Sequence, residues 1–280
     1  MTLMKPNRLK SGDKVAVVSP SWGGPSMCPH IYENGIKYLT EQLKLEIVEF
    51  PTARMSATEL ASNPKIRAMD INDAFANKEI KAVLSTIGGD DSVRILRYLD
   101  KDTITCNPKI LLGYSDTTTL NTLLNTWGLV TFNGPSIMAG FSQANQFPKS
   151  WHDTVKTILM GDSTDYIYPR FEKYSNGYPS WSNVENTGLV NELIESPQYN
   201  WLQGNSIVDG TLFGGCIEVF EFLKSTEYWP TKDFWKDKVL FFETSEDAPS
   251  AANVSYMLRN YGVQGIFDQI KALVFGRARD

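Results

Sequence analysis

The sequence predicts an α/β protein whose amino-terminal part is a parallel β-sheet covered by helices on both faces. Between Lys14 and Phe132, short apolar runs typical of buried strands alternate five times with segments whose apolar residues recur at helical spacing. The 280 residues are 42% hydrophobic and 21% charged, a balance able to bury a sizeable core. From about Ser142 the composition changes, so a further, smaller part of mixed α/β structure is expected.

The five expected strands are apolar runs of three to eight residues. They cover residues 14–19, 45–50, 80–87, 110–112 and 129–132. Helical spacing between them is marked by Tyr32, Ile36 and Leu39, by Ala68, Ile71 and Phe75, by Val93, Leu96 and Leu99, and by Leu120, Leu123, Leu124 and Trp127. Asn63 followed by Pro64 is typical of a helix start, so the second of these helices is expected to begin there.

Three loops follow these strands and are expected to meet at one edge of the sheet. They are residues 19–24, 88–91 and 113–116. The carboxyl ends of parallel strands lie at the same edge, which is where open α/β sheets hold ligands. The glycines of these loops match no dinucleotide-binding or P-loop spacing, so a nucleotide-phosphate site is weakly supported.

Ser115 lies in the third loop, on a tight turn between the 110–112 strand and the next helix. A serine there presents its hydroxyl at the top of the sheet, and the following N–H groups and the helix dipole can receive a developing negative charge. This is the geometry that acyl transfer needs. The alternative is that Ser115 only caps the helix, which is common.

Two further features can each be interpreted as functional or as purely structural. Gly88, Gly89, Asp90 and Asp91 could form an anion or oxyanion site from backbone N–H groups, or a tight turn with an aspartate cap. Glu243 ends the apolar run 238–243, where a carboxylate can orient a histidine as the acid of a Ser-His-acid triad. Its alternative is a strand-end charge that reaches solvent.

Residues 142–205 are rich in Trp, Tyr, Asn, Ser and Pro, and they lack clear periodicity. We expect a domain crossing with long loops, some lying over a site. Trp181 is either a stacking platform for substrate or a surface aromatic packed on its own loop.

Mixed structure resumes towards the carboxyl end. We expect strands at 207–213, 238–243 and 271–275, a helix at 216–224, and a helix through Val254, Leu258 and Tyr261 that Gly262 closes. The predicted domains are therefore a nucleophile domain at 1–145, crossing and substrate loops at 146–205, and an acid/base domain at 206–280.

Composition excludes several classes of function. A net charge of -5 without a basic run argues against nucleic acid as a partner. Cys28, Cys106 and Cys216 give no disulfide or zinc pattern, and His30 and His152 stand alone, so neither a metal nor a cofactor is expected. There is no signal-peptide pattern and no apolar run near the ~18 residues that span a bilayer, so we expect a cytoplasmic protein without a membrane partner.

Six segments together resemble motifs of the LD-carboxypeptidase serine peptidase family, and the last few are most similar to its microcin C immunity branch. The likeness runs from about Lys10 to Arg277. The segments are residues 88–92, 113–120, 134–140, 212–216, 242–246 and 258–262.

The resemblance implies a flavodoxin-like amino-terminal domain and a smaller carboxy-terminal domain that carries the acid and the histidine. It implies hydrolysis of an amide bond next to a free carboxylate, in muropeptides or in peptidyl- or aminoacyl-nucleotides. Ser115 would be the nucleophile, the N–H groups of Asp116 and Gly89 the oxyanion hole, and Glu243 the residue that orients the base. Trp181 lies in the region where the microcin branch stacks its substrate's base. A homodimer is also implied.

The sequence departs from the family pattern at one point. The family's histidine lies beyond the segment that matches Phe275, Gly276 and Arg277, and no histidine follows Arg277 here. We therefore expect a truncated carboxy-terminal domain without its general base. The alternative function is a non-catalytic ligand-binding remnant, because a serine without its base is a poor nucleophile.

Overall fold

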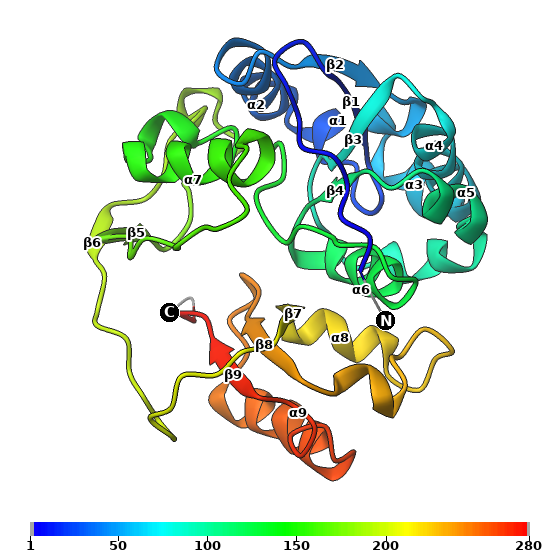
Figure 1. The fold of residues 1–280 in the computed structure, drawn as a ribbon. Helices are drawn as coiled ribbons and strands as arrows, with labels where there is room; N and C mark the ends of the chain where they lie inside the picture. Colours follow the sequence, from blue (N-terminus) through cyan, green and yellow to red (C-terminus); the bar gives the residue numbers. More distant parts are fainter. Residues whose placement is uncertain (1–2, 279–280) are drawn as a thin grey trace.

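The computed structural model describes residues 3–278 and forms two lobes joined by a long connecting region (Figure 1). The upper lobe contains a parallel sheet of four strands in the order β2-β1-β3-β4. These strands are β1 (Lys14–Val18), β2 (Glu46–Glu49), β3 (Ile80–Ser85) and β4 (Ile110–Leu112). The predicted α/β class and the parallel amino-terminal sheet are confirmed.

The expected fifth strand does not form a ladder. Residues 129–132 make only isolated bridges, Leu129 to Met4 and Phe132 to Leu112. Phe132 nevertheless accepts a hydrogen bond from the N–H of Gly113 at 3.2 Å, so this segment runs beside the turn that contains Ser115. Leu129 is buried, whereas Val130, Thr131 and Phe132 are partly exposed, and the prediction of a regular strand was wrong.

Helices cover both faces of the first sheet. They are α1 (Gly24–Met27), α2 (Pro29–Glu41), α3 (Ala57–Ser62), α4 (Pro64–Ala76), α5 (Lys101–Cys106), α6 (Thr118–Thr126) and α7 (Lys149–Met160). The expected start at Asn63 is confirmed, since its side chain accepts a hydrogen bond from the N–H of Ile66 at 3.3 Å. The segment expected to be a helix after Asp91 is a 3₁₀ helix, Ser92–Tyr98.

Alternate residues of β1 enter two different cores, as the period of a strand requires. Val15 and Val17 belong to the core under α2 and α7, whereas Ala16 and Val18 belong to the core under α4 and α6. The second of these cores continues into the lower lobe and includes Phe213, Phe220 and Leu240. The two lobes therefore share one hydrophobic core.

The lower lobe is a second parallel sheet, β7 (Thr211–Cys216), β8 (Lys238–Glu243) and β9 (Ala272–Phe275), with α8 (Ile217–Leu223) and α9 (Ala251–Val263). Two predicted boundaries were wrong. The first strand begins four residues later than expected and runs to Cys216. Helix α9 continues through Gly262, and the left-handed glycine that follows it is Gly265 at φ +70°.

The connecting region contains more regular structure than its sequence indicated. Helix α7 lies within this region. Val155 and Leu159, on one face of the helix, are buried against the first sheet's core. The short strands β5 (Lys173–Ser175) and β6 (Leu193–Glu195) pair antiparallel. No helix in residues 3–278 is both long enough and apolar enough to span a membrane. The division at 145/146 and 205/206 stays a prediction.

Candidate active site

Ser115 lies on the sharp turn between β4 and α6, within the 3₁₀ helix Ser115–Thr117. Its φ is +55°, a left-handed conformation that non-glycine residues adopt rarely. The neighbouring Gly113 allows this turn, because a Cβ there would lie 2.3 Å from the Ser85 hydroxyl. A serine held this way on a strand-to-helix turn has the geometry of a nucleophile elbow.

The Gly88-Gly89 pair lies directly against Ser115. A Cβ on Gly88 would be 2.8 Å from the Ser115 hydroxyl oxygen and 3.4 Å from the N of Asp116. Gly89 has φ +139°, and a Cβ on it would be 2.3 Å from the Ser21 hydroxyl. Among the described residues, the backbone N–H groups of Gly89 and Asp116 have no hydrogen-bond acceptor. Both groups are therefore available to a ligand.

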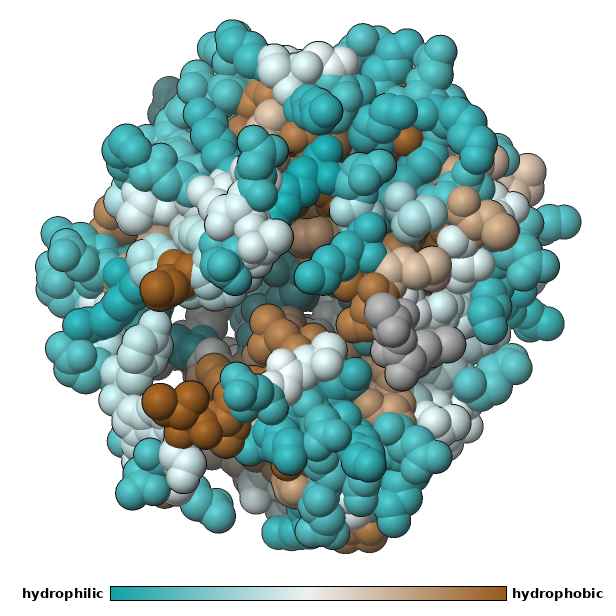
Figure 2. Space-filling view, in the orientation of Figure 1, coloured by the Kyte–Doolittle hydropathy of each residue, from teal (hydrophilic) through white to brown (hydrophobic). Residues whose placement is uncertain are grey.

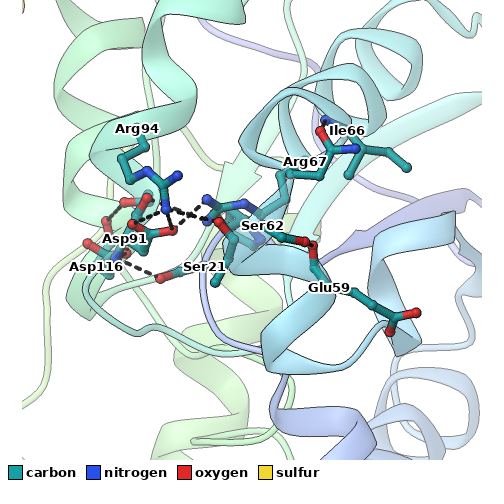
Figure 3. A network of polar contacts seen from close by, with 12 residues as sticks. Ser21, Glu59, Ser62, Ile66, Arg67, Asp91, Arg94 and Asp116 are labelled. Atoms are coloured by element: carbon teal, nitrogen blue, oxygen red, sulfur yellow. Dashed lines mark hydrogen bonds and ion pairs between the residues drawn. The ribbon is translucent and has the colours of Figure 1, made fainter.

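The side chain of Asp116 is buried and lies beside Asp91 and Ser21 (Figure 3). One of its carboxylate oxygens accepts hydrogen bonds from the N–H groups of Asp91, at 3.1 Å, and Ser92, at 2.8 Å. Burial raises the pKa of the Asp116 carboxyl above its usual value. Asp116 thus binds the loop that contains Asp91. Asp91 itself precedes the 3₁₀ helix Ser92–Tyr98 without a side-chain cap hydrogen bond, so the alternative of an aspartate cap in that turn is not seen.

Glu243 ends β8 and lies across from Ser115 in the same pocket. Its carboxylate accepts a hydrogen bond from the side-chain amide of Asn133 at 3.3 Å. Burial raises the pKa of Glu243, and the Asn133 hydrogen bond opposes that rise. Glu243 is therefore not the freely solvated strand-end charge of the alternative interpretation.

A second carboxylate supports the loop after Glu243. Glu218, in the first turn of α8, accepts hydrogen bonds from the N–H of Ser245 at 2.9 Å and from its hydroxyl at 2.7 Å. The Cys216 thiol donates weakly to Glu218 at 3.5 Å, and burial raises the pKa of that thiol. Cys216 therefore lines the pocket as a neutral thiol.

The pocket between the lobes has a volume of about 290 Å³ and is lined by both Ser115 and Glu243. Figure 2 shows the surface hollowed between the upper and lower lobes. The Arg277 guanidinium also lines the pocket and lies 3.7 Å from the ring centre of Tyr174. The other lining residues come mainly from the β5 hairpin and the loop after β8: Tyr114, Ser175, Asn176, Gly177, Tyr178, Cys216, Thr244, Ser245, Glu246 and Ala278.

Trp181 lies one layer behind this pocket. Its ring stacks on Tyr178 with centroids 4.5 Å apart, and Tyr178 lines the pocket. The indole N–H is buried without a hydrogen-bond partner. A direct stacking role for Trp181 stays a prediction, and the aromatic residues that line the pocket in this structure are Tyr114, Tyr174 and Tyr178.

Neither histidine lines the pocket among the described residues. His152 is on α7, where its Nδ1 lies 2.7 Å from the Tyr38 hydroxyl. His30 is on α2. In residues 3–278, no group of three or more His, Cys, Asp or Glu side chains could hold a metal ion.

Sequence reasoning missed Asn133, Glu218 and Arg67. Asn133 is 110 residues from the carboxylate that it contacts, and Glu218 is 27 residues from Ser245. Arg67 is an isolated cation within a helical pattern, yet its side chain is fully buried. No local pattern marks these residues, because their partners come from other strands and helices.

Comparison with known proteins matches both lobes to one family. A family model described as the LD-carboxypeptidase N-terminal domain matches residues 15–134, and one described as the LD-carboxypeptidase C-terminal domain matches residues 209–280. The microcin C7 self-immunity protein MccF of Escherichia coli is 27% identical over 96% of this chain and 76% of its own length. A probable murein peptide carboxypeptidase of Bacillus subtilis is 35% identical over 88% of this chain and 66% of its own.

Solved structures agree. MccF in complex with glutamyl sulfamoyl guanosine aligns with a TM-score of 0.83 at 25% identity, covering 99% of this chain and 80% of that one. An MccF-like protein from Bacillus anthracis aligns with a TM-score of 0.83 at 27% identity, covering 98% and 80%. The chain spans 76–80% of the lengths of the MccF relatives that it matches, and the expected truncation of its carboxy-terminal domain stays a prediction.

Proposed function

Because the chain belongs to the LD-carboxypeptidase family, we propose that it is a serine hydrolase that cleaves an amide bond next to a free carboxylate. Ser115 is the nucleophile in this proposal, the N–H groups of Gly89 and Asp116 are the oxyanion donors, and Glu243 is the triad acid. The observation that carries it is the left-handed Ser115 turn, which lies against Gly88 and shares one pocket with Glu243.

The proposed reaction begins with attack of the Ser115 hydroxyl oxygen on the amide carbonyl. The N–H groups of Gly89 and Asp116 stabilise the negative charge that forms on the carbonyl oxygen by donating hydrogen bonds to it. They have no other acceptor among the described residues and need no reorganisation. The amine leaves, and water then hydrolyses the acyl-serine. The carboxylate of Glu243 would orient the base that takes the serine proton and passes it to the leaving amine. The family resemblance gives that role to a histidine, and no histidine lines the pocket among the described residues.

Two substrate classes suit this site. A relative is named as a murein peptide carboxypeptidase, and MccF structures contain aminoacyl sulfamoyl nucleosides. A peptide carboxylate would meet the Arg277 guanidinium, whose five donors match a carboxylate. A nucleobase would meet Tyr178, backed by Trp181. The homodimer and the cytoplasmic location remain part of this proposal.

The second candidate function is ligand binding without turnover. The observation that favours it is the pocket lining, which contains no histidine among the described residues. A serine without a base is a weak nucleophile, although an oxyanion hole and binding alone retain some catalysis.

The first prediction tests the nucleophile. The purified protein is incubated with a muropeptide tetrapeptide and, separately, with aspartyl sulfamoyl adenosine, and products are separated by chromatography. We expect Ser115→Ala to lower turnover of the preferred substrate by about a thousandfold or more. Ser62→Ala, on the exposed end of α3, is the matched control and should change nothing.

Either of two results would decide against the hydrolase. Full turnover by Ser115→Ala would show that another residue is the nucleophile. Tight binding of both wild type and variant, with no turnover by either, would favour the binding function.

A further inference from the structure

The loop that contains Gly88 and Gly89 has no regular secondary structure, so something else must fix it beside Ser115. Three strand-end loops meet here: residues 19–24 after β1, 86–91 after β3 and 113–116 after β4. Figure 3 shows buried side chains from all of these parts pointing toward one another. The contacts among them explain how the loop keeps its position.

Asp116 links the β4 loop to the β3 loop. Its carboxylate accepts two N–H groups from Asp91 and Ser92, and the Ser92 hydroxyl donates back to the carbonyl oxygen of Asp116 at 2.8 Å. Asp116 and Ser92 are both completely buried. The carboxylate of Asp116 therefore fixes the residue that follows Ser115 to the loop that contains Gly88 and Gly89.

Arg67 on α4 links the β3 loop to the β1 loop. Its guanidinium forms an ion pair with Asp91 at 2.6 Å and donates to the carbonyl oxygen of Pro20 at 2.9 Å. The Ser21 hydroxyl, beside Pro20, accepts the N–H of Asp91 at 3.1 Å. The Arg67 side chain is fully buried, whereas that of Asp91 is 27% exposed, so this ion pair is largely shielded from water.

These contacts leave the loop's glycines with little freedom. The Trp22 N–H donates to the carbonyl oxygen of Gly88 at 3.1 Å, and Gly89 is packed on Ser21. A shift of the loop by one ångström would separate the N–H of Gly89 from that of Asp116. Oxyanion donors lose most of their effect when they are displaced, because their strength depends on being fixed in advance.

We propose that Asp116, through its carboxylate, and Arg67, through Asp91, are positioning residues that hold the Gly88–Gly89 turn beside Ser115 as a preformed oxyanion hole. The assignment rests on the proposed function, because an oxyanion hole serves acyl transfer. In this proposal the buried aspartate after Ser115 has two roles. Its N–H, which has no acceptor among the described residues, is one oxyanion donor, and its carboxylate anchors the loop that contains the other donor.

The test compares the affinities of wild type and variants for two ligands. A peptide boronic acid forms a tetrahedral, negatively charged adduct on a serine and needs both donors. The same peptide ending in a carboxylate forms no such adduct and does not need the two donors. We expect Asp116→Ala to weaken boronate affinity by about tenfold to a hundredfold while carboxylate affinity changes by less than about threefold. Asp116→Asn should restore most of the boronate affinity, because one amide oxygen can still accept both N–H groups.

Asp70→Ala is the matched control. Asp70 is also a buried carboxylate that accepts a backbone N–H, from Thr52 at 2.7 Å, but that hydrogen bond is not to the loop that contains Gly88 and Gly89. It should lower stability without changing the ratio of the two affinities. Equal loss of boronate affinity in Asp70→Ala and Asp116→Ala, or no loss in Asp116→Ala, would overturn the proposal.

Two further readouts keep the result decisive. If Asp116→Ala does not fold, Asp91→Asn takes its place, since that side chain is partly exposed and the amide weakens the Arg67 contact. If wild type neither turns over substrate nor binds the boronate, the proposed hydrolase fails, and hydrogen exchange of residues 86–91 decides the positioning claim separately. Faster exchange there in the Asp116 or Asp91 variant than in Asp70→Ala supports it, and equal exchange refutes it.

Discussion

The two sides of the candidate site are built differently. On the nucleophile side, Ser115 lies on a turn fixed by buried side chains from three loops, and the strands beneath it are buried on both faces. On the acid side, Glu243 is held by one hydrogen bond from the other lobe, at the end of a sheet whose last strand, β9, is largely exposed. The comparison suggests that the nucleophile side is rigid in isolation, whereas the acid side depends on how the lobes meet.

The largest effect is expected from a substitution on the Ser115 side of the site. In Gly88→Ala the new methyl group would lie 2.8 Å from the Ser115 hydroxyl oxygen and 2.9 Å from its Cβ, so the turn must shift. We expect turnover, or boronate binding if turnover is absent, to fall by about a hundredfold or more. Steady-state kinetics and titration measure this. Gly262→Ala controls for substitution of a glycine away from the site, because an added Cβ there would make only an ordinary contact, 3.6 Å from the Phe267 ring. Unchanged activity in Gly88→Ala would show that this turn is adaptable.

The next prediction concerns whether the two lobes unfold together. Leu111 in β4 and Leu240 in β8 are both almost completely buried and belong to one core. Leu111→Ala and Leu240→Ala should each lower the free energy of unfolding by about 2–5 kcal/mol. Because the core is shared, we expect one unfolding transition, shifted by both variants, in urea and calorimetric scans. Two transitions, each shifted by only one of the variants, would mean that the two lobes unfold independently despite the shared core.

The smallest expected effect is a pH dependence on the acid side. The folded protein raises the pKa of Glu243, so it holds this proton more tightly than the unfolded chain does. Stability then falls as the pH rises from the ordinary glutamate value of 4.5 through the raised value. Glu243→Gln removes this dependence. We expect its melting temperature to exceed that of wild type by a few degrees at neutral pH and to match it below pH 4.5.

Thermal melts across pH measure this difference. Glu246→Gln, an exposed neighbour in the same pocket lining, is the control and should follow the wild-type curve. A constant offset between Glu243→Gln and wild type at every pH would show that the carboxyl's proton equilibrium is not involved.

Much of the fold could be predicted from the sequence because its strands are short apolar runs followed by glycine-rich loops. The runs at 80–87, 110–112 and 238–243 indicated β3, β4 and β8, and the turn at Ser115 is where strand period changes to helical period. Helix α7 was missed although Trp151, Val155, Ile158 and Leu159 recur at helical spacing and pack against the first sheet's core. The polar residues on both sides of it masked this pattern.

The supporting residues of the site could not be predicted in the same way. Arg67 and Asp91 are 24 residues apart, and their contact exists only because α4 and the β3 loop pack together in three dimensions. Asp91 could equally have been a helix cap from its sequence alone. Local periodicity predicts which segments are buried, whereas side-chain contacts between loops depend on tertiary arrangement.

The left-handed backbone at Ser115 has a consequence for the whole molecule. A residue with a Cβ in this conformation is less stable than glycine by about 1 kcal/mol. That energy must come from the surrounding contacts, and a folded protein has only about 5–15 kcal/mol of net stability. The site therefore uses up an appreciable share of the margin that keeps the chain folded. Substitutions elsewhere in the shared core draw on that same margin, so a change far from Ser115 can remove the active conformation by unfolding the protein that enforces it.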